Sequence, residues 1–225
     1  MINLEFIVKE EQTRNGFLSI ENLSKMLLKL SSLESDIAND YMQENKLLWM
    51  IYSWDFQLNR EIKTGEVLEI STWVSEVSKI KLHREFLVKS KDEVVAKCLA
   101  EFLIIDANKR KAIRVPKQLM EYFEINNTKL LSVERVEEFE IEDSTSYTVE
   151  SSYFDENNHV NNSVYIRWIE KFLDESSDKS IKSLKIVYSK EINEQGIINV
   201  GFSKNIEYFE IYTKEIKAKG NMFLF

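Results

Sequence analysis

A short polar run carries the side chains that could do chemistry. Residues 155–162 read DENNHVNN and include His159, one of two histidines in the chain. Asp155 and Asn157 precede this histidine at alternate positions. Apolar residues recur at helical spacing from Val164 onward, so the run stands where an amphipathic helix begins. Because the first turn of a helix leaves backbone N–H groups unpaired, these donors and the polar side chains can face one reacting atom.

The same run also fits a purely structural interpretation. Asn and Asp are favoured in turns and at helix N-caps, so an isolated Asp-x-Asn-x-His is more often a turn followed by a cap than a catalytic site. Asn161 and Asn162 are the expected capping residues. A catalytic interpretation therefore needs support from the rest of the chain.

The overall composition narrows the class of protein. The 225 residues are 44% apolar and 30% charged, a mixture typical of a globular protein. The net charge of −8 argues against nucleic acid as a partner. The single cysteine, Cys98, lies between Ala96 and Ala100 on a small apolar face, so we expect a buried thiol in a reducing compartment. Because the sequence shows neither a signal peptide nor a membrane span, we expect a cytoplasmic protein.

Two short matches indicate an internal repeat. Residues 15–19 (NGFLS) align with residues 157–161 (NNHVN). Residues 60–62 (REI) align with residues 190–192 (KEI), and a glycine-led apolar stretch follows each. Because both matches occur in the same order, we interpret the chain as a duplicated domain.

The two aligned halves differ in the reactive side chains that they carry. Glu61 stands opposite Glu191, so both halves have the carboxylate. Phe17 stands opposite His159, so the first half lacks a histidine at this position. If the chain has a catalytic site, we therefore expect it in the second half.

Hydrophobic periodicity predicts similar elements in both halves. The first half begins with a strand over residues 4–9 and a helix capped by Ser19. The apolar face of that helix comprises Ile20, Leu23, Met26, Leu27, Leu30 and Leu33. Further elements are expected as strands over 48–58, 67–77, 81–89 and 94–105, a short helix over 118–123, and second-half strands over 146–153, 183–192, 197–202, 207–213 and the last residues to Phe225. This order indicates an α+β fold in which each helix packs on a curved antiparallel sheet.

We divide the chain into two domains and a connector. Residues 1–120 form the first domain, residues 121–145 an acidic connector, and residues 146–225 the second domain. Pro116 closes the first block of strands, and the acidic residues near 134–143 are typical of a solvated crossing segment.

The motifs resemble those of a known family. Asn-x-His-Val-Asn-Asn-x-x-Tyr at residues 157–165, with Tyr-Ser-Lys-Glu at 188–191, resembles acyl-ACP thioesterases of the FatA/FatB type. Residues 15–23, 54–72 and 105–116 are also similar to that family, so the resemblance covers essentially the whole chain. It implies a tandem hotdog fold of the bacterial form, in which two curved sheets each wrap a central helix. It also implies an acyl-chain pocket in the first domain, catalysis in the second, and neither a cofactor nor a metal.

The family's site residues carry over position by position. Its Asp-x-Asn-x-His motif matches Asp155, Asn157 and His159, and its downstream glutamate matches Glu191. Many members have Cys directly after that glutamate, where this chain has Ile192. A thiol nucleophile at this position is therefore excluded.

The implied reaction is thioester hydrolysis by activated water. Glu191 is our candidate general base, and Asn157 and His159 are candidate donors to the developing oxyanion. Asp155 could orient Asn157 or His159, or it could attack the thioester itself and form an anhydride. Both roles of Asp155 stay open.

The implied partner is an acyl carrier protein (ACP) that carries a fatty acyl thioester. ACP is acidic, so this acidic chain would need a local basic patch to bind it. Two stretches are candidates: Lys109, Arg110, Lys111, Arg114 and Lys117, and then Lys179, Lys182, Lys185 and Lys190. A monomer and a homodimer both agree with the sequence, because tandem domains already supply the pairing that single hotdogs obtain by dimerising.

Other functions remain as alternatives to acyl-ACP hydrolysis. An acyl-CoA thioesterase or a 3-hydroxyacyl thioester dehydratase would use the same fold, although the Asn-x-His-Val-Asn-Asn run does not resemble that of dehydratases. A non-catalytic binder of acyl thioesters is a further alternative. Thiol release distinguishes hydrolysis from dehydration and from binding alone.

Overall fold

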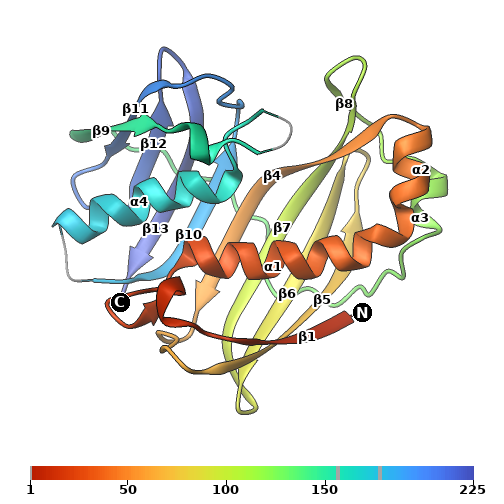
Figure 1. Cartoon of the computed structure of the whole chain (residues 1–225), viewed down its shortest axis with the longest axis horizontal. Helices are drawn as coiled ribbons and strands as arrows, with labels where there is room; N and C mark the ends of the chain where they lie inside the picture. Colours follow the sequence, from red (N-terminus) through yellow and green to blue (C-terminus); the bar gives the residue numbers. More distant parts are fainter. Residues whose placement is uncertain (1, 156–157, 177–178) are drawn as a thin grey trace.

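Two long helices, α1 and α4, lie against one face of a large antiparallel sheet (Figure 1). The structure, a computed structural model, describes residues 2–155, 158–176 and 179–225. The helices are α1 (Ile20–Ser35), α2 (Asn39–Glu44), α3 (Lys117–Met120) and α4 (Asn162–Ser176). The first-half strands are β1 (Ile2–Ile7), β2 (Thr13–Arg14), β3 (Phe17–Leu18), β4 (Leu47–Leu58), β5 (Val67–Val77), β6 (Lys81–Ser90), β7 (Glu93–Asp106) and β8 (Lys111–Ile113). The second-half strands are β9 (Asp143–Val149), β10 (Ile181–Tyr188), β11 (Gly196–Phe202), β12 (Tyr208–Tyr212) and β13 (Ile216–Leu224).

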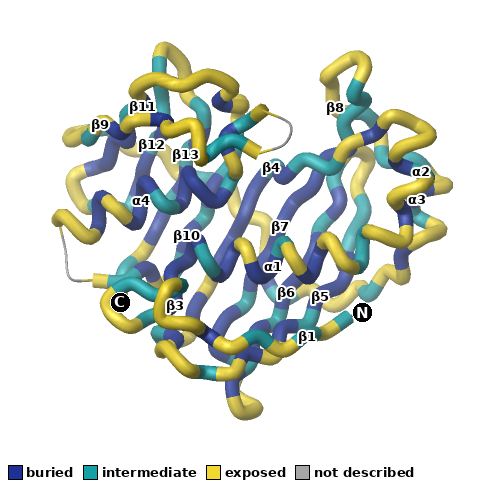
Figure 2. Tube along the Cα trace, viewed as in Figure 1, coloured by how far each residue is buried: buried dark blue, intermediate teal, exposed yellow. Residues whose placement is uncertain are grey.

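Equivalent strands occur in the same order in both halves when each half is read from the outer edge of the sheet towards the centre. The first half contributes β1-β5-β6-β7-β4, and the second contributes β10-β13-β12-β11-β9. The two meet where β4 pairs with β10 in antiparallel register. Each half thus has one helix over its own five strands, as the α+β prediction required. The buried residues lie along the central strands and on the helix faces that pack against the sheet (Figure 2).

The predicted cap and apolar face of α1 are confirmed except at one end. Ser19 Oγ accepts the backbone N–H of Asn22 at 3.1 Å, as an N-cap should. Leu27 and Leu30 are fully buried, but Leu33 is 45% exposed, so its prediction as a core residue was wrong. Each three-residue step falls about 60° short of a full helical turn, so Leu33 has rotated past the edge of the buried stripe.

Two predicted strands end earlier than the sequence suggested. The strand expected over 146–153 stops at Val149, and a 3-10 turn follows over Ser151–Tyr153. The strand expected over 183–192 stops at Tyr188, because the next two backbone N–H groups both bond to the carbonyl of Lys217, at 2.8 and 3.1 Å. Glu191 therefore lies in a loop beyond the strand. Helix α2 and strand β8 were not predicted.

One matching hydrogen bond in each half supports the internal repeat. In the first half, the backbone N–H of Leu18 donates to the carbonyl of Ile62 at 2.7 Å. In the second half, Val160 donates to Ile192 at 2.8 Å. The two sequence matches therefore meet in space in the same way in both halves.

A charged pair lies at the centre of the junction between the halves. Asp55 of β4 and Lys185 of β10 face each other in the register, and each lies six residues before its repeat's glutamate. They therefore occupy equivalent positions on a pseudo-twofold axis. Lys185 Nζ donates to Asp55 Oδ2 at 3.4 Å, and both side chains are largely buried. Burial raises the pKa of the Asp55 carboxyl, while the positive charge of Lys185 opposes that rise.

We expect Lys185→Met to lower the free energy of unfolding by about 3 kcal/mol, because it leaves Asp55 buried without its cation. Urea denaturation at pH 7 measures the change. Lys182→Met, at an exposed position on the same strand, is the matched control and should change stability by less than about 0.5 kcal/mol. Equal stability of the Lys185→Met and wild-type chains would contradict a structural role for the pair.

Candidate active site

The loop that carries His159 is closed by Asp155. The Asp155 carboxylate accepts the backbone N–H of His159 at 3.1 Å, and the Asp155 N–H donates to the His159 carbonyl at 2.8 Å. Asn158 sits in the left-handed region with φ 61°, which Asn tolerates better than most residues. The sequence therefore folds into a tight local turn that fixes the backbone of His159.

The start of α4 is joined to this loop. Asn161 donates its backbone N–H to the Tyr153 carbonyl at 2.9 Å. Its side-chain oxygen accepts the backbone N–H of Ser163 at 3.0 Å, so Asn161 caps the helix as predicted. The hydrogen bond from Val160 to Ile192 then brings the second loop alongside the first.

His159 and Glu191 meet at this junction. His159 Nε2 lies 3.1 Å from Glu191 Oε2, and the two side chains are 20% and 48% exposed. A carboxylate in this position can reach both the imidazole and a water molecule. The pair can therefore move a proton between solvent and a bound substrate.

The predicted site residues are only partly assembled within the described part of the chain. His159 and Glu191 are in direct contact, and Asp155 reaches the same loop through the His159 backbone. Asn157 lies outside the described residues. The catalytic roles assigned to these four residues stay predictions.

Two tyrosines pack close to the site. The rings of Tyr165 and Tyr188 meet edge to face, with centroids 5.3 Å apart. The Tyr188 hydroxyl donates to the Asn162 carbonyl at 3.0 Å. Burial raises the pKa of the Tyr165 phenol, and the negative charge of Glu191 adds to that rise. Tyr165 therefore stays protonated beside the candidate base.

A residue from the other half also reaches the site. Arg110, in the turn between β7 and β8, places Nη2 3.2 Å from His159 Nε2 and 3.9 Å from Glu191 Oε2. Sequence reasoning had assigned Arg110 only to a docking patch. The local pattern gave no signal for this contact, because it depends on how the two halves pack.

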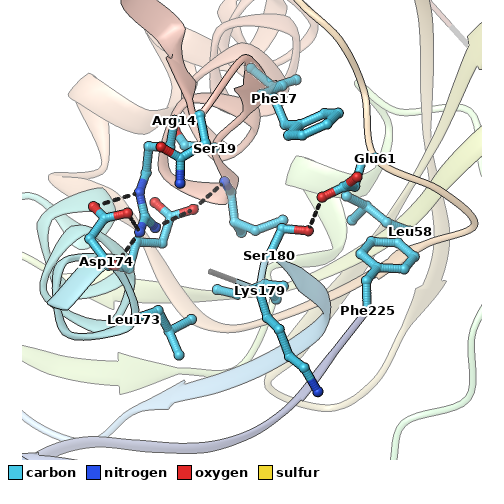
Figure 3. A pocket seen from close by; sticks show the side chains of 15 residues that line it. Arg14, Phe17, Ser19, Leu58, Glu61, Leu173, Asp174, Lys179, Ser180 and Phe225 are labelled. Atoms are coloured by element: carbon cyan, nitrogen blue, oxygen red, sulfur yellow. Dashed lines mark hydrogen bonds and ion pairs between the residues drawn. The ribbon is translucent and has the colours of Figure 1, made fainter. Parts of the chain in front are cut away.

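The matching position in the first half holds a cavity of different chemistry (Figure 3). Phe17 and Glu61 line it, where the second half has His159 and Glu191. The Glu61 carboxylate accepts a hydrogen bond from the Ser180 hydroxyl. This cavity therefore keeps the carboxylate of the candidate site without its histidine.

Helix α1 starts at this cavity and is capped from α4. The Glu170 carboxylate accepts the backbone N–H groups of Ile20 at 2.7 Å and Glu21 at 3.2 Å. Arg14 Nη1 lies 3.6 Å from the same carboxylate, and Arg14 also pairs with Asp174. The donors at the start of α1 are thus occupied by a side chain of the protein itself.

Burial raises the pKa of Glu170 to about 7, although Arg14 and the two N–H groups act in the opposite direction. Within residues 2–155, 158–176 and 179–225, no group of three or more His, Cys, Asp or Glu side chains is placed to hold a metal ion. Cys98 is fully buried, as predicted.

We expect Glu170 to make stability depend on pH. Its pKa is higher in the folded chain than its ordinary value of 4.5. Between these two pKa values, the carboxyl is protonated in the folded chain but ionised in the unfolded chain. The free energy of unfolding should therefore fall between about pH 4.5 and 7, by an amount of order 3 kcal/mol. Glu170→Gln, which keeps an oxygen for the Ile20 N–H, should remove that part of the slope in urea titrations at several pH values. An unchanged slope would contradict the assignment.

Two models of one protein family match this chain along most of its length. The family model for the acyl-ACP thioesterase N-terminal domain matches residues 5–123, and the model for the C-terminal domain matches residues 135–221. A chloroplastic palmitoyl-acyl carrier protein thioesterase from Arabidopsis thaliana is 24% identical over 170 residues, covering 70% of this chain and 41% of that protein. A second one, from Gossypium hirsutum, is 26% identical over 143 residues, covering 59% and 35%. The chain thus spans about a third to two fifths of the length of these two curated relatives.

Solved structures share the whole fold. An acyl-ACP thioesterase from Bacteroides thetaiotaomicron superposes with a TM-score of 0.86 at 20% identity, covering 99% of this chain and 97% of that one. A 12:0-ACP thioesterase from Umbellularia californica gives a TM-score of 0.87 at 16% identity, covering 100% and 96%. These superpositions confirm the predicted tandem hotdog fold. With both family models matched in sequence order along most of its length, the chain belongs to the acyl-ACP thioesterase family.

Proposed function

We propose that this protein hydrolyses the thioester of acyl-ACP to free fatty acid and ACP. One observation carries the proposal: in a chain of this family, the imidazole of His159 and the carboxylate of Glu191 lie 3.1 Å apart beside the start of α4. No helix in the described residues has the length and apolar character needed to cross a membrane. We also propose a cytoplasmic location, for which the unpaired Cys98 is the support.

In the proposed reaction, Glu191 acts as the general base. It takes a proton from water as the water oxygen bonds to the thioester carbonyl carbon. The carbon–sulfur bond then breaks, and the proton passes to the leaving thiolate. His159 donates to the oxygen that becomes negative during the attack, and Asn157 is proposed as a second donor from its place in the motif.

We assign Asp155 an orienting role in this reaction. Its carboxylate already accepts the backbone N–H of His159 at 3.1 Å, which supports a structural use of that group. In the alternative, in which Asp155 attacks the thioester, the nucleophile would be a carboxylate that is already tied to the backbone of its own loop through Oδ1. Glu191 is exposed enough to contact water and has the better position for a base.

The acyl chain is proposed to occupy the first domain, residues 1–120, while residues 146–225 supply the catalytic groups. A cavity of about 230 Å³ lies between α1 and the sheet in the first half. Trp49 of β4 and Phe102 of β7 line it. Strand β7 continues from Phe102 to Asp106, directly before the turn that contacts His159. A chain bound in this cavity would thus point toward the proposed reaction site.

One of the two basic stretches is the better candidate for ACP docking. The first stretch is exposed throughout and surrounds the turn that contacts His159: Lys109, Arg110, Lys111, Arg114 and Lys117. In the second stretch, Lys185 is buried against Asp55 and Lys190 pairs with Glu215. We therefore propose that ACP binds the first stretch.

The two equivalent glutamates provide a matched test of the proposed site. Glu191→Ala should lower kcat on acyl-ACP by at least about 100-fold, because it removes the base. Glu61→Ala should retain most of the activity, because the first half has Phe17 where the second half has His159. Released thiol measures the rate, and circular dichroism checks folding. Equal losses from both variants would contradict a single site in the second half.

Salt dependence tests the proposed docking surface. We expect kcat/KM on acyl-ACP to fall by about tenfold or more between low salt and about 0.5 M NaCl, because salt screens the attraction between ACP and the basic stretch. Hydrolysis of a neutral acyl-pantetheine should change little over the same range. A flat salt response with acyl-ACP would favour a small thioester, such as acyl-CoA, as the natural substrate.

A further inference from the structure

Arg110 holds an unusual backbone position. It ends the turn between β7 and β8 with φ 51°, in the left-handed region that favours glycine and asparagine. Asp106 fixes this turn: its carbonyl accepts the Arg110 N–H at 2.8 Å, and its carboxylate accepts the N–H groups of Asn108 and Lys109 at 3.0 Å. A long side chain is thus kept at a position where glycine would fit more easily.

The guanidinium of Arg110 lies against the proposed catalytic pair. Nη2 is 3.2 Å from His159 Nε2, and that nitrogen is 3.1 Å from Glu191 Oε2. Within the part of the chain that the structure describes, these two side chains are the polar contacts of the guanidinium. The group is 70% exposed, so a substrate can reach it.

The number of donors at this point exceeds the number of acceptors. A guanidinium stays protonated and has five N–H donors but no acceptor. At most one of these N–H groups, on Nη2, can donate to His159 Nε2, which lies 3.2 Å away. Glu191 Oε2, at 3.9 Å, is beyond hydrogen-bond range of Nη2. The other N–H groups of this exposed guanidinium therefore face solvent beside the atoms proposed to react, where a bound substrate can replace water as their acceptor.

We propose that Arg110 is a catalytic residue of the second-half site, supplied by the first half, and that it donates a hydrogen bond to the thioester carbonyl oxygen as that oxygen becomes negative. This assignment rests on the proposed thioesterase function. It makes the site a joint product of the two halves. A permanent cation stabilises the oxyanion without any proton transfer, and both the water attack and the loss of thiolate proceed as described above.

The left-handed backbone permits a test that separates catalysis from folding. Arg110→Gly should fold at least as stably as wild type, because glycine adopts this φ freely. Its kcat should fall about 100-fold or more, as for loss of an oxyanion donor, with a smaller change in KM. Added guanidinium ion should restore part of the activity, since the vacated position is open to solvent. The matched control is Lys91→Gly, which removes a basic side chain at φ 49° from the exposed β6–β7 turn and should leave the rate unchanged.

Two substrates distinguish a contact with the reacting atoms from a role in docking. Arg110→Gly should lose a similar factor in kcat on acyl-ACP and on a neutral acyl-pantetheine. A loss confined to acyl-ACP, a rise in KM alone, or activity within about threefold of wild type would overturn the assignment. Loss of folding that accounts for the lost activity, without rescue by guanidinium, would also overturn it. If the wild-type chain hydrolyses neither thioester, the proposed function and this assignment are both wrong. If the wild type and Arg110→Gly are both active, only the assignment of Arg110 is wrong.

Discussion

The pairing of β4 with β10 is the interaction on which the rest of the structure depends. It joins two five-stranded halves into one sheet and fixes the position of each helix relative to the other half. In a dimer of identical chains, a residue on the twofold axis faces its own copy, so a charge there meets a like charge. In a tandem chain the two equivalent positions can hold different residues, so Asp55 can face Lys185. The duplication thus permits a favourable charged pair at a position where exact symmetry would forbid it.

The same freedom explains why two similar backbones have different chemistry. Leu18 and Val160 make equivalent hydrogen bonds to the loops that carry Glu61 and Glu191. At α1, however, the first backbone donors are bound by Glu170 of α4. Counted from the two helix caps, the position that matches Glu170 is Leu28 of α1, which has no carboxylate to offer the start of α4. One helix start is therefore used to join the halves, while the other adjoins His159.

The sequence alone was sufficient for features that depend on local pattern. The cap at Ser19, the β5 strand and the repeated motifs follow from spacing and residue type, and the family resemblance then brought His159 and Glu191 together. Features that depend on how one element of the chain packs against another were not predictable. Leu33 fits the apolar pattern of α1 but lies outside the part of the helix that the sheet covers. Lys185 resembles a surface lysine in the sequence, and only the strand pairing places Asp55 opposite it. Arg110 reaches His159 across the junction, which no local pattern records.

The residue after each glutamate shows why a thiol is dispensable at that position. Ile62 and Ile192 both serve through their backbone carbonyls, which accept the N–H groups of Leu18 and Val160 at 2.7 and 2.8 Å. Both side chains are buried among apolar neighbours, so an apolar residue satisfies the position fully. The backbone contact brings Glu191 to His159 whatever side chain follows it. Ile192 in place of cysteine therefore leaves the contact between Glu191 and His159 intact, and the proposed reaction uses the carboxylate and the imidazole without a thiol.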